Sequence, residues 1–407
     1  MLSIALYFNW PVQQLDVANA FLHGNLSETI YIKQPKGFED STRPQHVCRL
    51  NKAIYGLKQA PRQWYNRFTA FLLTLGFSHS QADPSLLIYP KAQVSIFLLI
   101  YVDDILITGN NQQHINHILT RLDSEFAMKR LGQVSEFLGI KISKSNNSYF
   151  LSQAKYALKI LQQADLTLCN PLANPTCTKL PSEYTSVFLN ENPAQYRSIT
   201  GALQYLTLTR PDISFSVNLL SQHMHEPLQK HFYLLKRLLR YIKGTLHFGL
   251  PITKTDLVLK SFSDVDWAGD PITRKSTTGF CSFLGDTLIS WTLKKQNTVS
   301  RSSTESEYRA LAALTSDIIW LRRLLTDFGI SQNYPTNLYC DNMSAIALAN
   351  NPVFHSRTKH VEIDQKFIRD HIQQNHIVLH PISTRIKSLT FLRSHSQRLG
   401  SKILGAN

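Results

Sequence analysis

The chain has 407 residues, a formal net charge of +15 and 43% hydrophobic against 17% charged residues, which excludes a disordered polyelectrolyte and a small disulfide-stapled scaffold. Its five cysteines are too scattered to indicate a zinc cluster or a disulfide framework. A basic excess on a folded chain favours a polyanionic partner, most commonly nucleic acid. No apolar stretch approaches the roughly 20 residues that span a bilayer, and the N-terminus lacks a basic signal-peptide region. We therefore expect an intracellular protein (cytoplasmic particle or nucleus) without membrane contact.

Composition shifts near residues 170–192 and 249–256 divide the chain into parts with different periodicity. The first part alternates short apolar runs with helical patterns, the second is mostly helical, and the third reads strand, strand, strand, helix, strand, helix. The predicted class is α/β (α+β). The predicted boundaries are 1–145, 146–250, 251–385 and a divergent tail at 386–407.

A first cluster of carboxylates follows from the strand patterns of the first part. Residues 94–102 predict an apolar strand, 105–108 predict its returning partner, and Asp103 and Asp104 lie at the turn. A strand-like segment near the N-terminus ends at Asp16, so a third carboxylate can join the pair. Adjacent aspartates repel each other unless they are solvated at the turn or share a divalent cation. Three carboxylates on neighbouring strands are typical of a two-metal site with Mg²⁺ (or Mn²⁺) that performs phosphoryl transfer.

Three helices are predicted from the spacing of apolar residues. The first, 61–75, has proline in its first turn and Gly76 at its end, and its face carrying Trp64 and Phe68 belongs to the core. The third, 304–328, has an apolar stripe at near-heptad spacing. The second, 231–243, carries three cations on one face, which is either a solvated surface or a contact for a nucleic-acid backbone. These cations are Lys236, Arg240 and Lys243.

A second cluster of carboxylates is expected in the third part. Asp264 lies at the end of a predicted strand, Asp341 ends another strand, and Glu307 lies at the start of the long helix. This arrangement is typical of a ribonuclease H fold, in which bound metals support cleavage of the RNA strand of a hybrid. For Glu307 there is an alternative, because Thr304 and Glu307 have the spacing of a helix capping box.

Ordered motifs in both halves of the chain resemble one known family. LDVANAFLHG, LNKAIYGLKQAPRQWY, YVDDILITGNN and FLGIKI are similar to the reverse transcriptase of copia-type long-terminal-repeat retrotransposons. SDVDWAGD, SSTESEYRALA, CDNMSAIAL and RTKHVEID are similar to the ribonuclease H region of the same Pol polyproteins. The resemblance implies a palm and thumb with incomplete fingers, a helical connection and a ribonuclease H-like domain. It also implies an RNA template, a DNA primer, an RNA/DNA hybrid and dNTPs as partners, and leaves the oligomeric state open.

The resemblance also assigns roles to individual residues. By position in the motifs, the two carboxylate clusters are the metal ligands, Phe21 is the aromatic gate against a ribose 2′-hydroxyl, and the cations of 231–243 face the hybrid backbone. Residues that contact template and nucleotide are Tyr55, Gly56, Lys58, Pro61 and Arg62. Residues that grip the primer end are Phe137, Leu138 and Gly139.

Both ends of the chain depart from the family pattern. Fifteen residues precede Asp16, which leads us to expect an incomplete nucleotide pocket, and no Asp or Glu follows Asp370, so the fourth ribonuclease H acid is missing unless Glu362 or Asp364 replaces it. The departures indicate a truncated copy. They support the alternative of an inactive remnant that at most binds nucleic acid, whereas the paired LDV and YVDD motifs exclude a cellular nuclease with an unrelated N-terminal domain.

Overall fold

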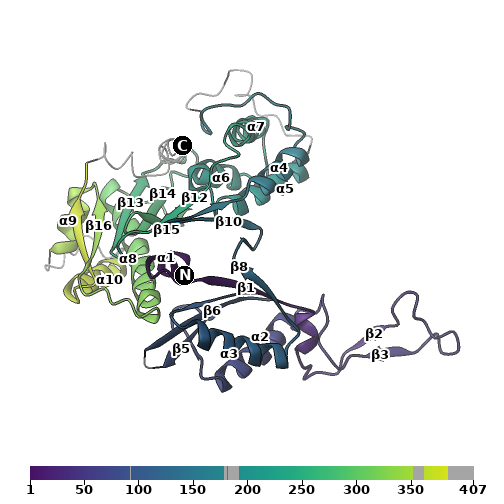
Figure 1. The fold of residues 1–407 in the computed structure, drawn as a ribbon. Helices are drawn as coiled ribbons and strands as arrows, with labels where there is room; N and C mark the ends of the chain where they lie inside the picture. Colours follow the sequence, from purple (N-terminus) through teal and green to yellow (C-terminus); the bar gives the residue numbers. More distant parts are fainter. Residues whose placement is uncertain (92, 178–180, 182–191, 352–361, 384–407) are drawn as a thin grey trace. The chain divides into compact units, whose positions relative to one another are not determined.

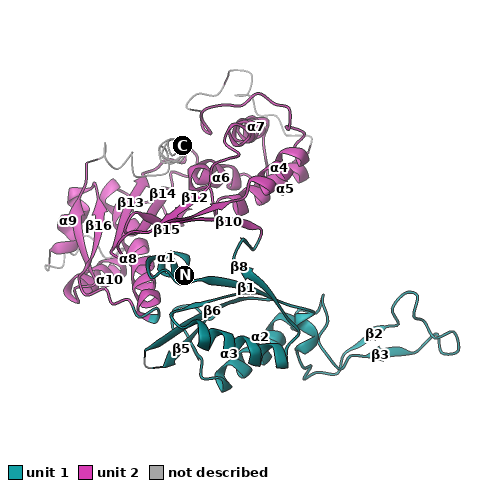
Figure 2. Ribbon diagram, viewed as in Figure 1, with its two compact units in different colours: residues 1–138, 327–329 teal, residues 139–326, 330–407 magenta. Residues whose placement is uncertain are grey.

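The computed structural model describes residues 1–91, 93–177, 181, 192–351 and 362–383. The chain forms two compact units, one of residues 1–138 with 327–329 and one of residues 139–326 with 330–407 (Figure 2). The predicted tail and the first five residues of the RTKHVEID motif lie outside the described residues. No described helix is both long enough and apolar enough to cross a membrane.

The first unit is built on a sheet in the order β4–β5–β6–β7–β1–β8, with antiparallel pairing in each adjacent pair whose register is given. Helices α2 and α3 cover one face of this sheet (Figure 1). Its elements are α1 (Leu2–Tyr7), β1 (Val12–Val17), a 3-10 helix (Ala20–His23), β2 (Tyr31–Lys33), β3 (Val47–Arg49), α2 (Ala60–Thr74), β4 (Ser78–His79), β5 (Leu86–Lys91), β6 (Val94–Tyr101), β7 (Asp104–Gly109), α3 (Gln112–Glu125), β8 (Met128–Gln133) and β9 (Glu136–Phe137).

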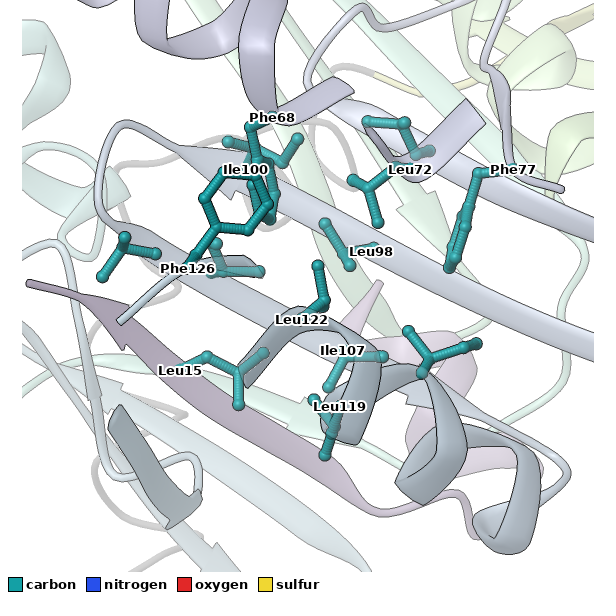
Figure 3. Close-up of a cluster of buried hydrophobic side chains, with 14 of the residues drawn as sticks. Leu15, Phe68, Leu72, Phe77, Leu98, Ile100, Ile107, Leu119, Leu122 and Phe126 are labelled. Carbon is teal, nitrogen blue, oxygen red and sulfur yellow. The ribbon is translucent and has the colours of Figure 1, made fainter. Parts of the chain in front are cut away.

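The core of the first unit lies between this sheet and the two helices. Figure 3 shows Leu98 and Ile107 of the sheet facing Leu72 of α2 and Leu119 of α3. The predicted helix 61–75 is confirmed within one residue, with proline in the first turn of α2 and Gly76 at a φ of 99°, which a glycine adopts without strain. Many fully buried side chains pack between these helices and strands. The ends of β1 and β7 are therefore supported by a close-packed core.

The second unit combines a small sheet with a helical group and a larger sheet. The larger sheet has the order β15–β14–β13–β16–β17, in which β13, β16 and β17 run parallel. The elements are β10 (Ile140–Ser145), β11 (Ser148–Ser152), α4 (Ala154–Gln163), α5 (Pro193–Leu206), a 3-10 helix (Pro211–Ile213), α6 (Ser214–Ser221), α7 (Gln229–Gly244), β12 (Leu250–Thr253), β13 (Leu259–Asp266), β14 (Thr277–Leu284), β15 (Thr287–Lys295), α8 (Ser303–Asp327), β16 (Thr336–Cys340), α9 (Met343–Asn350), α10 (Glu362–Gln373) and β17 (Ile377–Pro381).

The described residues of this second unit form three buried clusters, the smallest of which joins β12, β14 and β15. Helices α4, α5, α6 and α7 pack on one another, and α8 packs with β13, β16 and β17 and with α9 and α10. The predicted stripe on α8 is confirmed, because Leu311, Leu314 and Ile318 are fully buried and Leu321 and Leu325 nearly so. This apolar stripe therefore determines which face of α8 packs into the core.

Candidate functional site

The first carboxylate cluster lies where β1 meets the β6–β7 hairpin. Asp16 of β1 is directly opposite Asp104 of β7, and Asp103 occupies the turn before it. The backbone N–H of Val17 donates to the carbonyl oxygen of Asp103 at 3.2 Å, which fixes the turn against β1. Directly opposed residues of an antiparallel pair have Cβ atoms about 5 Å apart. Asp16 and Asp104 thus lie opposite each other near the ends of β1 and β7, with Asp103 in the adjoining turn, but the ligand atoms of the three carboxylates do not all lie within 4.8 Å of one another.

The pKa of Asp104 shows that the neighbouring acids repel one another at this end of the strands. Burial raises the pKa of Asp104, and the charges of Asp103 and Asp16 raise it further, while a hydrogen bond from Gln14 acts in the opposite direction. Glu136 of β9 adds a smaller repulsion. Carboxylate oxygens alone make up this donor set, which suits a hard cation such as Mg²⁺ or Mn²⁺. A bound cation would relieve the repulsion that the pKa of Asp104 records.

The turn that carries Asp103 has a support that the sequence did not predict. Val102 has a φ of 55°, and the indole N–H of Trp64 donates to its carbonyl oxygen at 2.6 Å. The spacing of α2 identified Trp64 only as a core residue. The available signal was its residue type, because a buried tryptophan needs an acceptor for its N–H.

The predicted nucleotide residues lie on the same unit, near the start of α2. Phe21, on the 3-10 helix after β1, has its ring centroid 5.9 Å from that of Tyr55, which is 89% exposed. Gly56 has a φ of 97° in open surroundings, so its conformation rather than close packing requires glycine. Lys58, Pro61 and Arg62 are exposed. Phe21 and Tyr55 form an aromatic pair, and the roles of all these residues stay predictions.

The predicted primer-grip residues begin with Phe137, the last residue of β9. Phe137 is half-buried, and Leu138 and Gly139 both have left-handed φ values, 52° and 68°. Two successive residues with positive φ are typical of the tight turns that join hairpin strands. The backbone therefore turns sharply at this motif, and its contact with a primer stays a prediction.

The three cations of α7 have different surroundings. Lys236 is exposed and Lys243 is half-buried, while Arg240 donates from Nε to the carbonyl oxygen of Asn170 at 2.7 Å. Arg240 thus also holds the segment of residues 170–172, because the N–H of Leu172 donates back to the Arg240 carbonyl oxygen. A contact with a nucleic-acid backbone stays a prediction for all three.

The second carboxylate cluster combines strand ends with the start of α8. The parallel register of β13 and β16 ends with Phe262 opposite Tyr339. Asp264 follows two residues later on β13, and Asp341 directly follows the end of β16. The described residues contain one group of potential metal ligands whose ligand atoms all lie within 4.8 Å of one another, and it consists of Glu307, Cys340 and Asp341. Asp264 does not belong to this group. Glu307 and Cys340 are buried, with 3.8 Å between the Cys340 sulfur and the Glu307 carboxylate.

The capping role considered for Glu307 is wrong, because Glu305 performs it. The N–H of Glu305 donates to the Ser302 hydroxyl at 3.1 Å, and the Glu305 carboxylate accepts from the N–H of Arg301 at 2.9 Å. This is a variant of the capping box, displaced by two residues from the predicted one. Glu307 therefore points to Cys340 instead of to the helix end.

The two acids considered as replacements for a fourth ligand lie at the start of α10. Burial raises the pKa of Asp364, and the charge of Arg309 lowers it. Asp364 also helps to raise the pKa of Tyr308 to about 12, an effect caused chiefly by burial. Asp364 thus interacts with Arg309 and Tyr308 of α8, and neither it nor Glu362 belongs to the group at Glu307. Their replacement of the fourth acid stays a prediction.

Comparison with known proteins identifies the family. A profile described as "Reverse transcriptase (RNA-dependent DNA polymerase)" matches residues 1–178. The chain is 45% identical over 385 residues to the "Retrovirus-related Pol polyprotein from transposon RE2" of Arabidopsis thaliana, an alignment that covers 94% of this chain and 26% of that polyprotein. It is 32% identical over 299 residues to a putative transposon Ty5-1 protein of Saccharomyces cerevisiae, covering 72% of this chain and 97% of that protein.

Among solved structures, the foamy viral protease-reverse transcriptase in complex with dsDNA matches with a TM-score of 0.21 and 11% identity, covering 92% of this chain and 68% of that chain. This score is too low to indicate a shared fold. The sequence relatives are decisive: the chain belongs to the reverse transcriptase family of copia-type retrotransposon Pol polyproteins. It spans about a quarter of the length of the Pol polyprotein from RE2.

Proposed function

We propose that this chain is an RNA-directed DNA polymerase that extends a DNA primer on an RNA template. The observation that carries the proposal is the placement of Asp16 opposite Asp104, with Asp103 in the adjoining turn. The raised pKa of Asp104 supports it, because burial and two neighbouring negative charges disfavour the ionised carboxylate, and a bound cation would stabilise that form. Asp16, Asp103 and Asp104 would hold Mg²⁺ or Mn²⁺.

The chain's own residues divide the remaining tasks of the reaction. When bound, the divalent cations supply activation of the primer 3′-hydroxyl and stabilisation of charge on the phosphoryl group. Phe21 and Tyr55 offer an aromatic surface for the incoming dNTP, and the exposed Lys58 and Arg62 offer positive charge to its phosphates or to the template. The turn at Leu138 orients the end of the primer.

A second activity, ribonuclease H cleavage of the RNA/DNA hybrid, is proposed for the second unit. The convergence of Glu307 and Asp341 at Cys340 supports it, as does the place of Asp264 on β13, the strand that pairs in parallel with β16. Glu307 and Asp341 supply carboxylate oxygens for a divalent cation, and Cys340 places a sulfur beside them. The exposed Lys236 and its neighbour Lys243 on α7 would contact the hybrid backbone without reading its sequence.

Extension of a DNA primer on an RNA template by the purified chain tests the main proposal. We expect extension in the presence of Mg²⁺, a loss of at least roughly 100-fold for Asp103→Asn, and little change for Asp123→Asn, which neutralises an exposed acid of α3. Hybrid binding without extension by the wild-type chain would overturn the polymerase proposal and favour the inactive, nucleic-acid-binding alternative.

A further inference from the structure

The turn between β6 and β7 contains a residue in an unfavourable backbone conformation. Tyr101 pairs with Asp104, so Val102 and Asp103 form a two-residue hairpin loop. Val102 occupies the first loop position with a φ of 55°. Positive φ at that position normally selects glycine, and it is least tolerated by β-branched residues. Some contact must therefore hold Val102 in place.

Trp64 supplies that contact from the facing helix. Its side chain is fully buried, and its indole N–H donates to the Val102 carbonyl oxygen at 2.6 Å. The carbonyl belongs to the peptide unit that leads directly into Asp103. The indole ring packs against Phe68 and Phe126, with centroid distances of 4.9 and 5.4 Å, so its orientation is fixed by the core. A fixed donor on the carbonyl restricts rotation of the peptide before Asp103.

We infer that Trp64 is a positioning residue, which holds Val102 in the left-handed conformation and thereby sets the direction of Asp103 and Asp104. The inference rests on the proposed polymerase function for its effect on the rate, and on geometry alone for its effect on the turn. A purely structural role for Trp64 would be met by any large aromatic side chain in the same core. The hydrogen bond distinguishes the positioning role from the purely structural role, because phenylalanine packs in the core but cannot donate a hydrogen bond.

Glycine at position 102 offers a direct test of this mechanism. Glycine adopts positive φ without a penalty, so a turn with Val102→Gly no longer needs the indole donor. Alanine removes the same branched methyl groups but keeps the Cβ that disfavours positive φ. Val102→Gly should therefore rescue Trp64→Phe, and Val102→Ala should do so much less. Phe68→Leu serves as the core control, because it removes aromatic volume beside Trp64 and keeps the indole donor to the Val102 carbonyl oxygen.

The first measurement is amide hydrogen exchange of the 99–106 peptide in the full chain, which needs neither metal nor activity. Trp64→Phe should raise the exchange rate of this peptide about fivefold, as expected for the loss of one buried hydrogen bond. Phe68→Leu should lower overall stability without this local increase. Equal exchange in Trp64→Phe and wild type would overturn the inference, whatever the activity of the chain.

The second measurement is kcat and KM for primer extension. Trp64→Phe should lower kcat roughly tenfold with KM for dNTP within about twofold, because it disturbs the metal-holding turn and not the nucleotide surface. The double variant with Val102→Gly should regain kcat to within about twofold, and the one with Val102→Ala should not. Equal failure of both double variants would show that Trp64 acts by packing, against the inference. If wild type shows no extension, the polymerase proposal fails and the exchange result alone decides whether Trp64 holds the turn.

Discussion

The two carboxylate clusters are built on opposite kinds of strand pairing. In the first unit, Asp103 and Asp104 sit at the turn of an antiparallel hairpin, and Asp16 comes from the adjacent antiparallel strand. In the second unit, Asp264 lies on β13, Asp341 directly follows the parallel strand β16, and the start of α8 adds Glu307. A hairpin site depends on the backbone of one tight turn. A parallel-strand site depends on the register of strands and on where a helix begins.

The two clusters also differ in burial and donor chemistry. Asp103 is exposed, and the first cluster offers oxygen alone, whereas Glu307 is 6% exposed and lies beside the buried sulfur of Cys340. Repulsion between the acids of the first cluster is recorded in the raised pKa of Asp104, to which burial contributes most. The first cluster is thus accessible to a large substrate, and the second is preorganised by packing.

The largest expected effect separates the two clusters by activity. Asp103→Asn should lower primer extension at least roughly 100-fold and leave hybrid cleavage nearly unchanged, and Glu307→Gln should do the reverse, because each removes one negative ligand from one site only. Both activities are measured on the same preparations. Loss of both activities in either variant, with an unchanged thermal midpoint, would contradict two independent sites.

A second prediction separates the units by stability. Leu72→Ala in the first core and Leu311→Ala in the second should each cost about 3 kcal/mol, since both side chains are fully buried and truncation leaves a cavity. We expect urea unfolding followed by site-specific probes to show each substitution shifting mainly the transition of its own unit. Identical shifts of both transitions would argue for one cooperative structure.

A third prediction concerns acid sensitivity of the scaffold outside both clusters. Burial, together with the smaller effects of the charges of His223 and Lys230, lowers the pKa of His231 to about 3. Since the folded pKa lies below the unfolded value, His231 contributes full stability above about pH 6.5 and loses it as the pH falls. Unfolding free energy should therefore decrease by about 2 kcal/mol between pH 7.5 and pH 5.

The matched variant for this effect is His231→Gln. The neutral imidazole accepts from the N–H of Leu228 at 2.9 Å through Nδ1, and glutamine keeps an acceptor at this third helical position. It should make the free energy of unfolding less dependent on pH over the same range. An unchanged slope would show that another group causes the acid sensitivity.

The smallest expected effect tests the helix start that positions Glu307. Ser302→Ala removes the acceptor of the Glu305 N–H and should cost about 1 kcal/mol of stability. Ser303→Ala, at an exposed neighbouring position, should change stability by less than about 0.5 kcal/mol. If Ser302→Ala also lowers hybrid cleavage more than extension, the start of α8 contributes to the geometry of the second cluster. Equal stability of the two variants would contradict the capping assignment.

Sequence patterns predicted the scaffold of both clusters well. The strand expected at 94–102 is β6 (Val94–Tyr101), and the helix expected at 304–328 is α8 (Ser303–Asp327). These elements have long apolar runs or stripes, so local sequence carries enough information. The pattern also predicts that Asp16 lies beside the turn with Asp103 and Asp104, and the register of β1 and β7 places Asp16 opposite Asp104. That the three form one metal site stays a prediction.

The choice between overlapping capping patterns and the contacts between distant segments could not be predicted in the same way. Ser302–Glu305 and Thr304–Glu307 both have capping spacing, and only the packing of α8 decides which pair caps the helix. The hydrogen bond from Trp64 to Val102 joins residues 38 positions apart. Neither the residue types nor their spacing indicates that these two segments meet, and the same holds for Arg240 and the Asn170 carbonyl group.

The most direct test of two separate metal-holding sites is a count of tightly bound Mn²⁺ by electron paramagnetic resonance titration. Wild type, Asp103→Asn, Glu307→Gln and the double variant are compared at equal concentration. The account predicts that each single variant loses a distinct part of the binding and that the double variant loses the sum of both parts. Unchanged Mn²⁺ binding in Asp103→Asn would contradict the claim that the hairpin turn holds a catalytic cation.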